Sequence, residues 1–475
     1  MKFQRHDLVW FQPSVDHSPE LNKWLENGLP CVVTRQNQLN QPLLSVALSL
    51  SADKSLFSRQ SFLIDPSVIY QHSRALPIMR LTEIISHSQL PNLIQALDNL
   101  GVEPRIFGSY SWQILTGRDY VKAGSDIDVV VQINSLQQLT QLSVILIKLE
   151  QIIARRIDVE LVFAECYTVA WREWQSLAQQ LLVKTYYSQE LLSRENLLDM
   201  ILSPEQQQLI FLAREALYAE LNCYPKAGLV SFVDSGSHLD MSSDTFLASI
   251  DALNSYWYTV LELGANGANF SELVAAGKHA ERLMLQATQN INTHRGAIFI
   301  MGILLAGIAY AAANKLPFNR VPEVIQQLWG QQLLEHRISV ESHGKMVRRR
   351  YPDLAANIIT DAAGGFVSIF ETYLPWLREI YLSNSDTAYI ELFYRLLSQV
   401  NDTNLLYRGG LTGLQFAQNL GIEFINTGGV NQIDWFEQAE QIHRQLVMQQ
   451  LSPGGCADLL AATIFIHSVE QELWD

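Results

Sequence analysis

The sequence has few cysteines and no cysteine pair of the kind that holds a metal. Its four cysteines, Cys31, Cys166, Cys223 and Cys456, are far apart along the chain, whereas zinc and redox sites use closely spaced pairs. This distribution predicts a reduced protein of the cytoplasm, where disulfides are rare. The opening residues, MKFQRHDLVWFQPS, also lack the apolar core of a secretory signal peptide.

Basic residues are in the minority. There are 33 Lys and Arg against 48 Asp and Glu, which gives a formal net charge of −15. Nucleic-acid binding depends on clustered Lys and Arg at the phosphates, so we expect no nucleic-acid partner. The compact basic run Arg348-Arg349-Arg350 is interpreted as a surface helix end, with a phosphate clamp as the alternative.

Long apolar runs are scarce. The segment 297–313, AIFIMGILLAGIAYAAA, is the one that could pass for a membrane span. It is short for a full crossing and rich in small residues. We therefore predict a buried central helix and no membrane association.

Two common nucleotide-binding motifs are missing. The sequence contains neither Gly-x-x-x-x-Gly-Lys-Ser/Thr nor Gly-x-Gly-x-x-Gly. A nucleotide would instead have to be held at helix N-termini, by basic residues and by carboxylate-bound metal.

The length of 475 residues and the apolar content of 48% predict two or three domains with large cores. The first half alternates strands and helices, which predicts an α+β domain over residues 1–195. Periodicity beyond about residue 203 is helical almost throughout, which predicts an all-α domain over 203–475. Ser203 and Pro204 suit the N-cap and first turn of the helix that opens this domain. In the first half we expect strands at 31–34, 61–64, 105–107, 129–132 and 157–163, and helices at about 81–100 and 135–155.

The stretch from Gly108 to Asp128 contains two features of a magnesium–triphosphate site. The pair Gly108-Ser109 follows a short apolar strand, and its backbone amides can face a phosphate. Ser125 then leads into Asp126 and Asp128 at the start of the next strand. Because residues i and i+2 of a strand share a face, the two carboxylates are expected to project together. Paired carboxylates beside an amide-rich turn suit Mg²⁺ and a triphosphate.

A third carboxylate is expected from a neighbouring strand. The segment 157–163 offers Asp158 and Glu160 on one face, and we favour Asp158. An Asp-x-Asp pair at a strand edge is usually only a solvated surface. The Gly-Ser turn and the second acidic strand make the metal site the better interpretation.

The polar residues of the second half gather where apolar helices begin. Singly, each is explained by helix capping or by a surface position, but capping does not require His, Lys, Asp and Glu together. The candidates for substrate or phosphate contacts are Lys226, His238, Asn292, Thr293, Arg295 and Arg408, and those for metal or acid–base roles are Asp234, Asp240, Glu281, His294 and Asp458. The junction Ser342-His343-Gly344 also belongs to this set.

The first half resembles the polymerase-β-like nucleotidyltransferases, whose signature is Gly-Ser followed by a spaced Asp-x-Asp. It is more similar to the malonate decarboxylase holo-acyl-carrier-protein synthase, a phosphoribosyl-dephospho-CoA transferase. That family's GSY-x-WQ-x-LTG, SD-x-D and VAWREW motifs match residues 108–117, 125–128 and 169–174. The resemblance covers about residues 1–190.

The second half resembles the triphosphoribosyl-dephospho-CoA synthases over about residues 205–475. The motifs that carry the resemblance include Pro-Lys-x-Gly-Leu-Val, Gly-x-His-x-Asp-Met, Asn-Thr-His-Lys/Arg-Gly and Ser-Pro-Gly-Gly-x-Ala-Asp-Leu-Leu. Two positions depart from the family pattern. Tyr407 stands where a His is expected, and Arg295 where the citrate lyase branch has Lys.

These resemblances imply a bifunctional enzyme. The second half would join ATP and 3′-dephospho-CoA with release of adenine, with Asp240 and Glu281 in metal or base roles and His294 near the reacting ribose. The first half would transfer the phosphoribosyl-dephospho-CoA group to a serine of the malonate decarboxylase acyl carrier protein. There Mg²⁺ would be held by Asp126, Asp128 and Asp158 or Glu160, and Ser109 and the amides near Gly108 would hold the triphosphate.

Two other functions fit parts of the sequence. The first half could transfer a nucleotidyl group to another protein or to a small molecule, using the same acids. A nucleotide-sensing scaffold with degenerate sites is a non-enzymatic alternative, although intact acids in both halves disfavour it.

Overall fold

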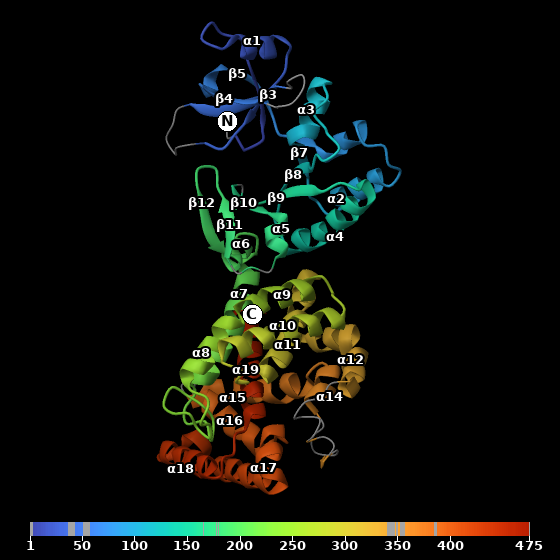
Figure 1. Cartoon of the computed structure of the whole chain (residues 1–475). Coiled ribbons are helices and arrows are strands. Elements are labelled where there is room, and N and C mark those ends of the chain that lie inside the picture. Colours follow the sequence, from blue (N-terminus) through green and yellow to red (C-terminus); the bar gives the residue numbers. More distant parts are fainter. Residues whose placement is uncertain are drawn as a thin grey trace. The chain divides into compact units, whose positions relative to one another are not determined.

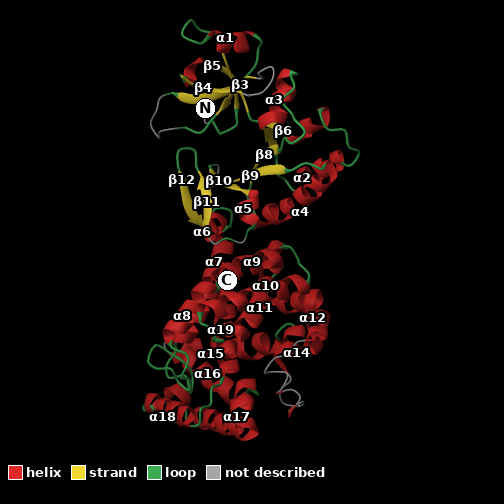
Figure 2. Cartoon of the chain, viewed as in Figure 1, coloured by secondary structure: helices red, strands yellow, loops and turns green. Residues whose placement is uncertain are grey.

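The computed structural model describes residues 3–36, 43–50, 58–164, 166–176, 178, 180–339, 347, 350–351, 357–383 and 387–474. The chain forms two compact units, Met1–Leu202 and Ser203–Asp475, shown in Figure 1 along the sequence and in Figure 2 by secondary structure. The first unit mixes strands and helices. In the second unit, every regular element of the described part is helical.

The first unit begins with a five-stranded antiparallel sheet in the order β4-β3-β2-β1-β5. Apolar side chains of this sheet pack with Leu21 and Trp24 of helix α1 to form a core. Trp112, from beyond the sheet, packs against this core and meets Trp24 edge-on, with ring centroids 5.5 Å apart. The elements are β1 (Leu8–Phe11), α1 (Pro19–Glu26), β2 (Cys31–Val33), β3 (Leu44–Leu50), β4 (Ser58–Ile64) and β5 (Ile69–Ser73).

A seven-stranded sheet follows, in the order β12-β11-β10-β9-β8-β7-β6. Its central strands β8 and β9 run parallel, and its other neighbours are antiparallel. Helix α4 connects β8 to β9, as a parallel pair requires. The strands are β6 (Leu76–Pro77), β7 (Arg105–Phe107), β8 (Ile127–Gln132), β9 (Ile157–Phe163), β10 (Tyr167–Ala170), β11 (Gln180–Lys184) and β12 (Gln189–Ser193), and the helices are α2 (Leu90–Asn99), α3 (Gly108–Thr116), α4 (Leu136–Ile153), α5 (Trp171–Gln175) and α6 (Arg194–Asp199).

The continuous helix predicted over about 81–100 is wrong. A short 3₁₀ segment ends at Glu83, and α2 begins only at Leu90 with a proline, Pro91, in its first turn. Proline suits a helix start and cannot continue a helix from the preceding turn. Gly101 follows the helix with φ of 70°, a conformation that ends helices readily when the residue is glycine.

The second unit starts at α7 (Pro204–Asn222). Ser203 caps this helix, and Gln206 returns the hydrogen bond, so that a complete capping box forms. The sequence predicts a domain boundary between about residues 190 and 203, and the two units of the structure divide between Leu202 and Ser203. The further helices are α8 (Ser243–Ala252), α9 (Asn254–Ala265), α10 (Phe270–Ala287), α11 (Arg295–Ala313), α12 (Val321–Ser339), α14 (Asn357–Ala363), α15 (Leu374–Ser383), α16 (Ala388–Gln399), α17 (Thr403–Asn426), α18 (Trp435–Met448) and α19 (Gly454–Val469).

Helix α11 lies at the centre of this unit, packed against α9, α12 and α19. The prediction of a buried central helix is confirmed, because most of its side chains are buried. By length and composition alone it is the one helix of the described residues that could cross a membrane. Gly302 lets it approach the hydroxyl of Tyr256, which donates a hydrogen bond to the Ile298 carbonyl at 2.8 Å. Most of the Arg348–Arg350 run and all of the Ser342-His343-Gly344 junction lie outside the described residues.

Candidate active sites

The first candidate site lies where β7 passes into α3. Gly108 begins the helix with φ of 68°, a conformation that favours glycine. The carboxylate of Asp128, on the adjacent strand β8, occupies the space that a side chain at Gly108 would fill. The Asp128 carboxylate therefore lies against the start of α3, which also contains Ser109. Ser125 shapes the turn before β8, because its hydroxyl accepts a 2.8 Å hydrogen bond from the Lys122 amide.

The acidic residues of β8 and β9 are brought together by their parallel register. Asp128 pairs with Asp158, and Val130 pairs with Glu160. Asp126 lies just before β8 rather than within it, and its carboxylate is 3.6 Å from the Arg156 guanidinium. Burial and the nearby carboxylates of Asp158, Asp126 and Glu160 raise the pKa of Asp128 to about 7.

Glu160 is held by the start of the chain. Its carboxylate accepts hydrogen bonds from Arg5 at 2.9 and 3.1 Å and lies 2.9 Å from Nε2 of His6. Burial raises the pKa of Glu160, but the hydrogen bond from His6 and the charges of His6, Arg5 and Lys184 outweigh burial and bring it to about 2. The sequence offered no local signal for this contact across 154 residues.

The chemistry of these side chains suits a hard divalent cation, because Mg²⁺ prefers carboxylate oxygens. The pKa of Asp128 is raised first by burial and then by repulsion from the neighbouring carboxylates, and a bound cation would relieve the repulsion. The Glu160 carboxylate is already occupied by Arg5 and His6, so Asp126, Asp128 and Asp158 are the better donors. In the part of the chain that the structure describes, no three acidic, His or Cys side chains stand in metal-binding geometry.

The second candidate site surrounds the loop from Lys226 to Asp240. Lys226 is 1% exposed and forms a buried ion pair with Glu220, near the end of α7. Its charge is therefore already balanced inside the unit. Glu220 was missed by the sequence analysis, because no local pattern links it to a lysine six residues later.

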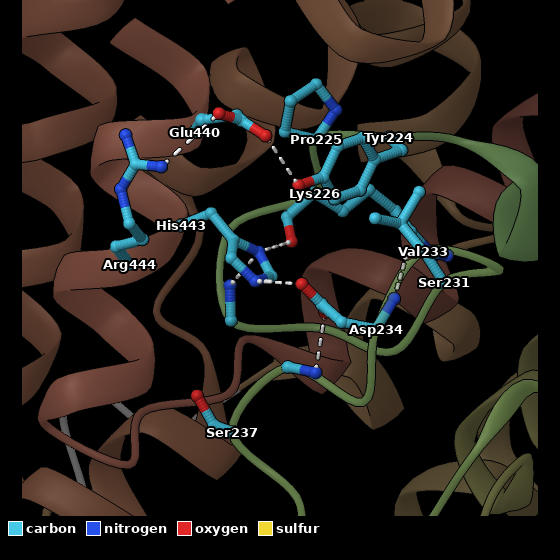
Figure 3. A network of polar contacts seen from close by, with 12 residues as sticks. Tyr224, Pro225, Lys226, Ser231, Val233, Asp234, Ser237, Glu440, His443 and Arg444 are labelled. Atoms are coloured by element: carbon cyan, nitrogen blue, oxygen red, sulfur yellow. Dashed lines mark hydrogen bonds and ion pairs between the residues drawn. The ribbon is translucent and has the colours of Figure 1, made fainter. Parts of the chain in front are cut away.

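The side chain of His443, on α18, holds this loop by contacting the backbone of the loop (Figure 3). Its Nδ1 is 3.0 Å from the Lys226 carbonyl and 3.3 Å from the Gly228 amide nitrogen, and its Nε2 is 3.1 Å from the Asp234 carboxylate. Asp234, predicted as a metal or acid–base group, here orients His443. His443 was also missed, because it lies more than 200 residues from the loop it holds.

His294 is buried at the start of α11. Its Nδ1 is 2.6 Å from the Ser249 hydroxyl, which in turn accepts a 2.8 Å hydrogen bond from the Thr293 hydroxyl. The imidazole Nε2 is buried and has no hydrogen-bond partner within the described chain. Burial, together with the charge of Lys226, lowers the pKa of His294 to about 3, so the ring is neutral at physiological pH.

His238 and Arg408 form a second polar group. Arg408 donates to Nδ1 of His238 at 3.2 Å, and Nε2 of His238 is 2.9 Å from the Ser452 hydroxyl. Burial and the Arg408 charge lower the pKa of His238 to about 4, although Asp240 acts in the opposite direction. Arg408 also donates to the backbone carbonyls of Ser237 and Gln450. The group thus ties the Asp234–Asp240 loop to the segment that precedes α19.

The remaining predicted residues lie beside the start of α11 and at the surface. Arg295 donates to the Glu281 carboxylate at 3.1 Å, and both side chains are partly exposed. Asn292 accepts a 3.3 Å hydrogen bond from the Arg295 amide, so it contributes to capping α11. Asp240 is exposed, 3.8 Å from His238.

Two aspartates link the starts of three helices. Asp402 caps α17 and also accepts a 2.9 Å hydrogen bond from the Cys456 amide in α19. Asp458 of α19 lies against Gly296 in the first turn of α11, where a larger residue would collide with its carboxylate. Burial and the charges of Asp402 and Glu220 raise the pKa of Asp458 well above its ordinary value, although a backbone hydrogen bond from Ala297 opposes them.

The second site therefore joins several small polar groups around the starts of α11 and α19. Both helices are long and have glycine in the first turn, Gly296 in one and Gly454-Gly455 in the other. Some amides of these first turns are already paired, because the Cys456 amide donates to Asp402 and the Ala297 amide to Asp458. Accessible charged side chains lie nearby, including Arg295 and Arg408. These exposed cations are the groups of the second site that suit a polyphosphate substrate.

Family models match almost the whole chain. The model for ATP:dephospho-CoA triphosphoribosyl transferase matches residues 206–475. Models for the N-terminal and C-terminal domains of phosphoribosyl-dephospho-CoA transferase MdcG match residues 4–75 and 77–195. The region 1–195, which we treated as a single domain, thus corresponds to two matched domains, each with one of the two sheets.

Known proteins resemble the second unit. A protein of Acinetobacter calcoaceticus named "Probable 2-(5''-triphosphoribosyl)-3'-dephosphocoenzyme-A synthase" is 36% identical over 276 residues, covering 57% of this chain and 94% of the relative. A Vibrio cholerae protein of the same name is 32% identical over 275 residues, covering 55% and 87%. A solved Archaeoglobus fulgidus protein, assigned as a triphosphoribosyl-dephospho-CoA synthase, is 19% identical, with all of that chain and 48% of this one aligned at a TM-score of 0.30. At that TM-score the likeness does not establish a shared fold.

The transferase model alone spans more than half of the chain, and the two MdcG models fall in order before it. This chain is therefore a transferase that belongs to the ATP:dephospho-CoA triphosphoribosyl transferase family and carries the two MdcG domains in its N-terminal unit.

Proposed function

We propose that the chain carries out two consecutive steps in making a prosthetic group. The second unit joins ATP to 3′-dephospho-CoA, and the first unit transfers the resulting phosphoribosyl-dephospho-CoA group to an acyl carrier protein. The observation that carries the proposal is the presence of both family matches in one chain, each over a unit with its own polar site.

In the second unit, the ribose 2′-hydroxyl of 3′-dephospho-CoA attacks C1′ of the ATP ribose. A C–O bond forms, the bond from C1′ to adenine breaks, and the hydroxyl proton is finally carried by adenine. The exposed cations Arg295 and Arg408 suit the triphosphate. Glu281, partly exposed beside Arg295, is the residue we assign to activating the hydroxyl, and Asp240 is the second candidate for a base or metal ligand.

In the first unit, a serine hydroxyl of the carrier attacks the α-phosphate of that product. A P–O bond to serine forms and the bond to the leaving pyrophosphate breaks. Asp126, Asp128 and Asp158 would hold Mg²⁺, which when bound would neutralise charge on the phosphates and favour the serine alkoxide. The amides at the start of α3 and the Ser109 hydroxyl would hold the remaining phosphates. In this respect the domain would work as a polymerase-β-like nucleotidyltransferase.

The double variant Asp126→Asn plus Asp128→Asn tests whether the two sites act independently. Adenine release from ATP and 3′-dephospho-CoA should continue at the wild-type rate, while loading of the malonate decarboxylase carrier, followed by intact mass, should be abolished. Loss of both activities in a folded variant would refute independent sites. Normal loading would show that Asp126 and Asp128 have no catalytic role.

A further inference from the structure

Three side chains at the start of α11 form a directed hydrogen-bond chain. The Thr293 hydroxyl donates to the Ser249 hydroxyl at 2.8 Å, and the Ser249 hydroxyl lies 2.6 Å from Nδ1 of His294. Ser249 is fully buried. The Ser249 hydroxyl has one hydrogen to donate, and because it is buried that hydrogen needs an acceptor within the protein.

This constraint identifies which nitrogen of His294 carries the proton. Ser249 already accepts from Thr293, and among the contacts of the described residues its hydroxyl has no acceptor other than Nδ1 of His294. Ser249 therefore donates to Nδ1. Nδ1 is then unprotonated, and the proton of the neutral imidazole is on Nε2.

The Nε2–H group points into the protein without a partner. It is buried, and no acceptor in the described chain bonds it. The imidazole meets the ring of Phe246 edge-on, with a centroid distance of 5.0 Å, and the charge of Lys226 also acts on it. A buried donor left unpaired is costly to the ligand-free protein. Such a donor is expected where a substrate supplies the missing acceptor.

We propose that the Nε2–H of His294 donates a hydrogen bond to a ring nitrogen, N3 or N7, of the adenine that leaves ATP, and that Ser249 and Thr293 are positioning residues that fix this tautomer. This inference rests on the proposed adenine-releasing reaction. The aromatic neighbour Phe246 suits a purine. The donor stabilises the electron pair that adenine takes from the broken C1′–N9 bond, and His294 itself gains and loses no proton.

Two variants of His294 distinguish a role as hydrogen-bond donor from a role as proton-accepting base. His294→Gln keeps an amide N–H near the position of Nε2 but cannot accept a proton as a base, whereas His294→Ala keeps neither function. We expect adenine release to fall by no more than about tenfold in His294→Gln and by about 10²–10³-fold in His294→Ala, as for loss of a transition-state donor. Equal losses in both folded variants would overturn the proposal.

Substrate analogues test the acceptor atom in the unaltered protein. ATP analogues in which N3 or N7 is replaced by carbon, 3-deaza-ATP and 7-deaza-ATP, should differ in their rates of base release. The analogue that lacks the true acceptor should react slowly with the wild-type chain and should lose little more in His294→Ala. If His294→Ala slows both analogues as much as it slows ATP, the donor does not act on the base, and the proposal fails.

Thr293 offers a matched pair that leaves the imidazole in place. Thr293→Ser keeps the hydroxyl and should preserve the rate and the tautomer. Thr293→Val keeps the shape but removes the hydrogen bond that orients the Ser249 hydroxyl, so we expect a lower kcat at nearly constant KM for ATP. The ¹⁵N shifts of His294 should show an unprotonated Nδ1 in the wild type. A wild-type ring protonated at Nδ1 would overturn the tautomer assignment. The shifts need no turnover, so they distinguish failure of this assignment from failure of the proposed reaction.

Discussion

Gly108 offers the sharpest test of the geometry of the first site. A methyl group at this position would overlap Oδ2 of Asp128 and would lie 2.9 Å from its Cγ, which is closer than the shortest ordinary contact of 3.4 Å. The Asp128 carboxylate would have to move by at least about 0.5 Å, and a misplacement on the order of 1 Å costs about 10²-fold in rate. Gly108→Ala should therefore slow carrier loading by about 10–100-fold.

Gly117 provides the matched control at the other end of α3. Its φ of 69° is nearly that of Gly108 at 68°, but a methyl group there would have no neighbour within 4 Å. Both alanine variants should lose about 1–2 kcal/mol because of the left-handed backbone, and melting of the first unit should fall by about 2–8 °C in each. Gly117→Ala should load the carrier normally.

Intact mass of the carrier over time measures loading, with preformed triphosphoribosyl-dephospho-CoA as donor so that the second unit does not limit the rate. Adenine release by both variants should equal that of the wild type. Equal loading by Gly108→Ala and Gly117→Ala would refute the placement of Asp128 at the start of α3 as a catalytic requirement.

Three further predictions concern the second unit. Burial raises the pKa of Glu262 to about 8 from an ordinary 4.5, so the wild type should lose stability as pH rises from about 5 to 8, by at most about 1.4 kcal/mol per pH unit. Urea unfolding at pH 5 and pH 8 should show that the stability of Glu262→Gln rises relative to the wild type. A stability difference that is the same at both pH values would contradict the shift. His443→Ala leaves the buried Gly228 amide without its acceptor and should cost about 1–3 kcal/mol of unfolding free energy and more than tenfold in adenine release. Tyr224→Phe removes only a 3.0 Å hydrogen bond to Glu440 and should release adenine within about twofold of wild type. Glu281→Gln should abolish adenine release measured by chromatography, and release at the normal rate would exclude Glu281 as the base.

Local patterns predicted the helical second unit and part of the first unit, where strands such as β3 (Leu44–Leu50) and β11 (Gln180–Lys184) were not expected. The strand 157–163, the helix after Ser135 and the buried helix α11 follow from periodicity and capping residues. The error over 81–100 arose because apolar spacing was carried through Pro91, which starts a helix more readily than it continues one. The two-sheet division of the first unit was missed, since neither sheet has a separate compositional signal.

The candidate sites could be predicted in their local parts only. Motifs contained Asp128, His294 and Arg408, because each lies in a short run with its polar neighbours. The partners that set the state of these groups come from distant segments. Glu160 is bound by Arg5 and His6, and His294 is oriented by Ser249, 45 residues earlier. Such pairs depend on tertiary packing, which no spacing rule in a single sequence encodes.

The most direct test of the central claim is chromatography of the purified chain incubated with ATP and Mg²⁺, with and without 3′-dephospho-CoA. The proposed function predicts free adenine that forms only when 3′-dephospho-CoA is present, in amounts equal to the dephospho-CoA consumed. A folded chain that releases no adenine, or that releases it equally without 3′-dephospho-CoA, would contradict the synthase reaction.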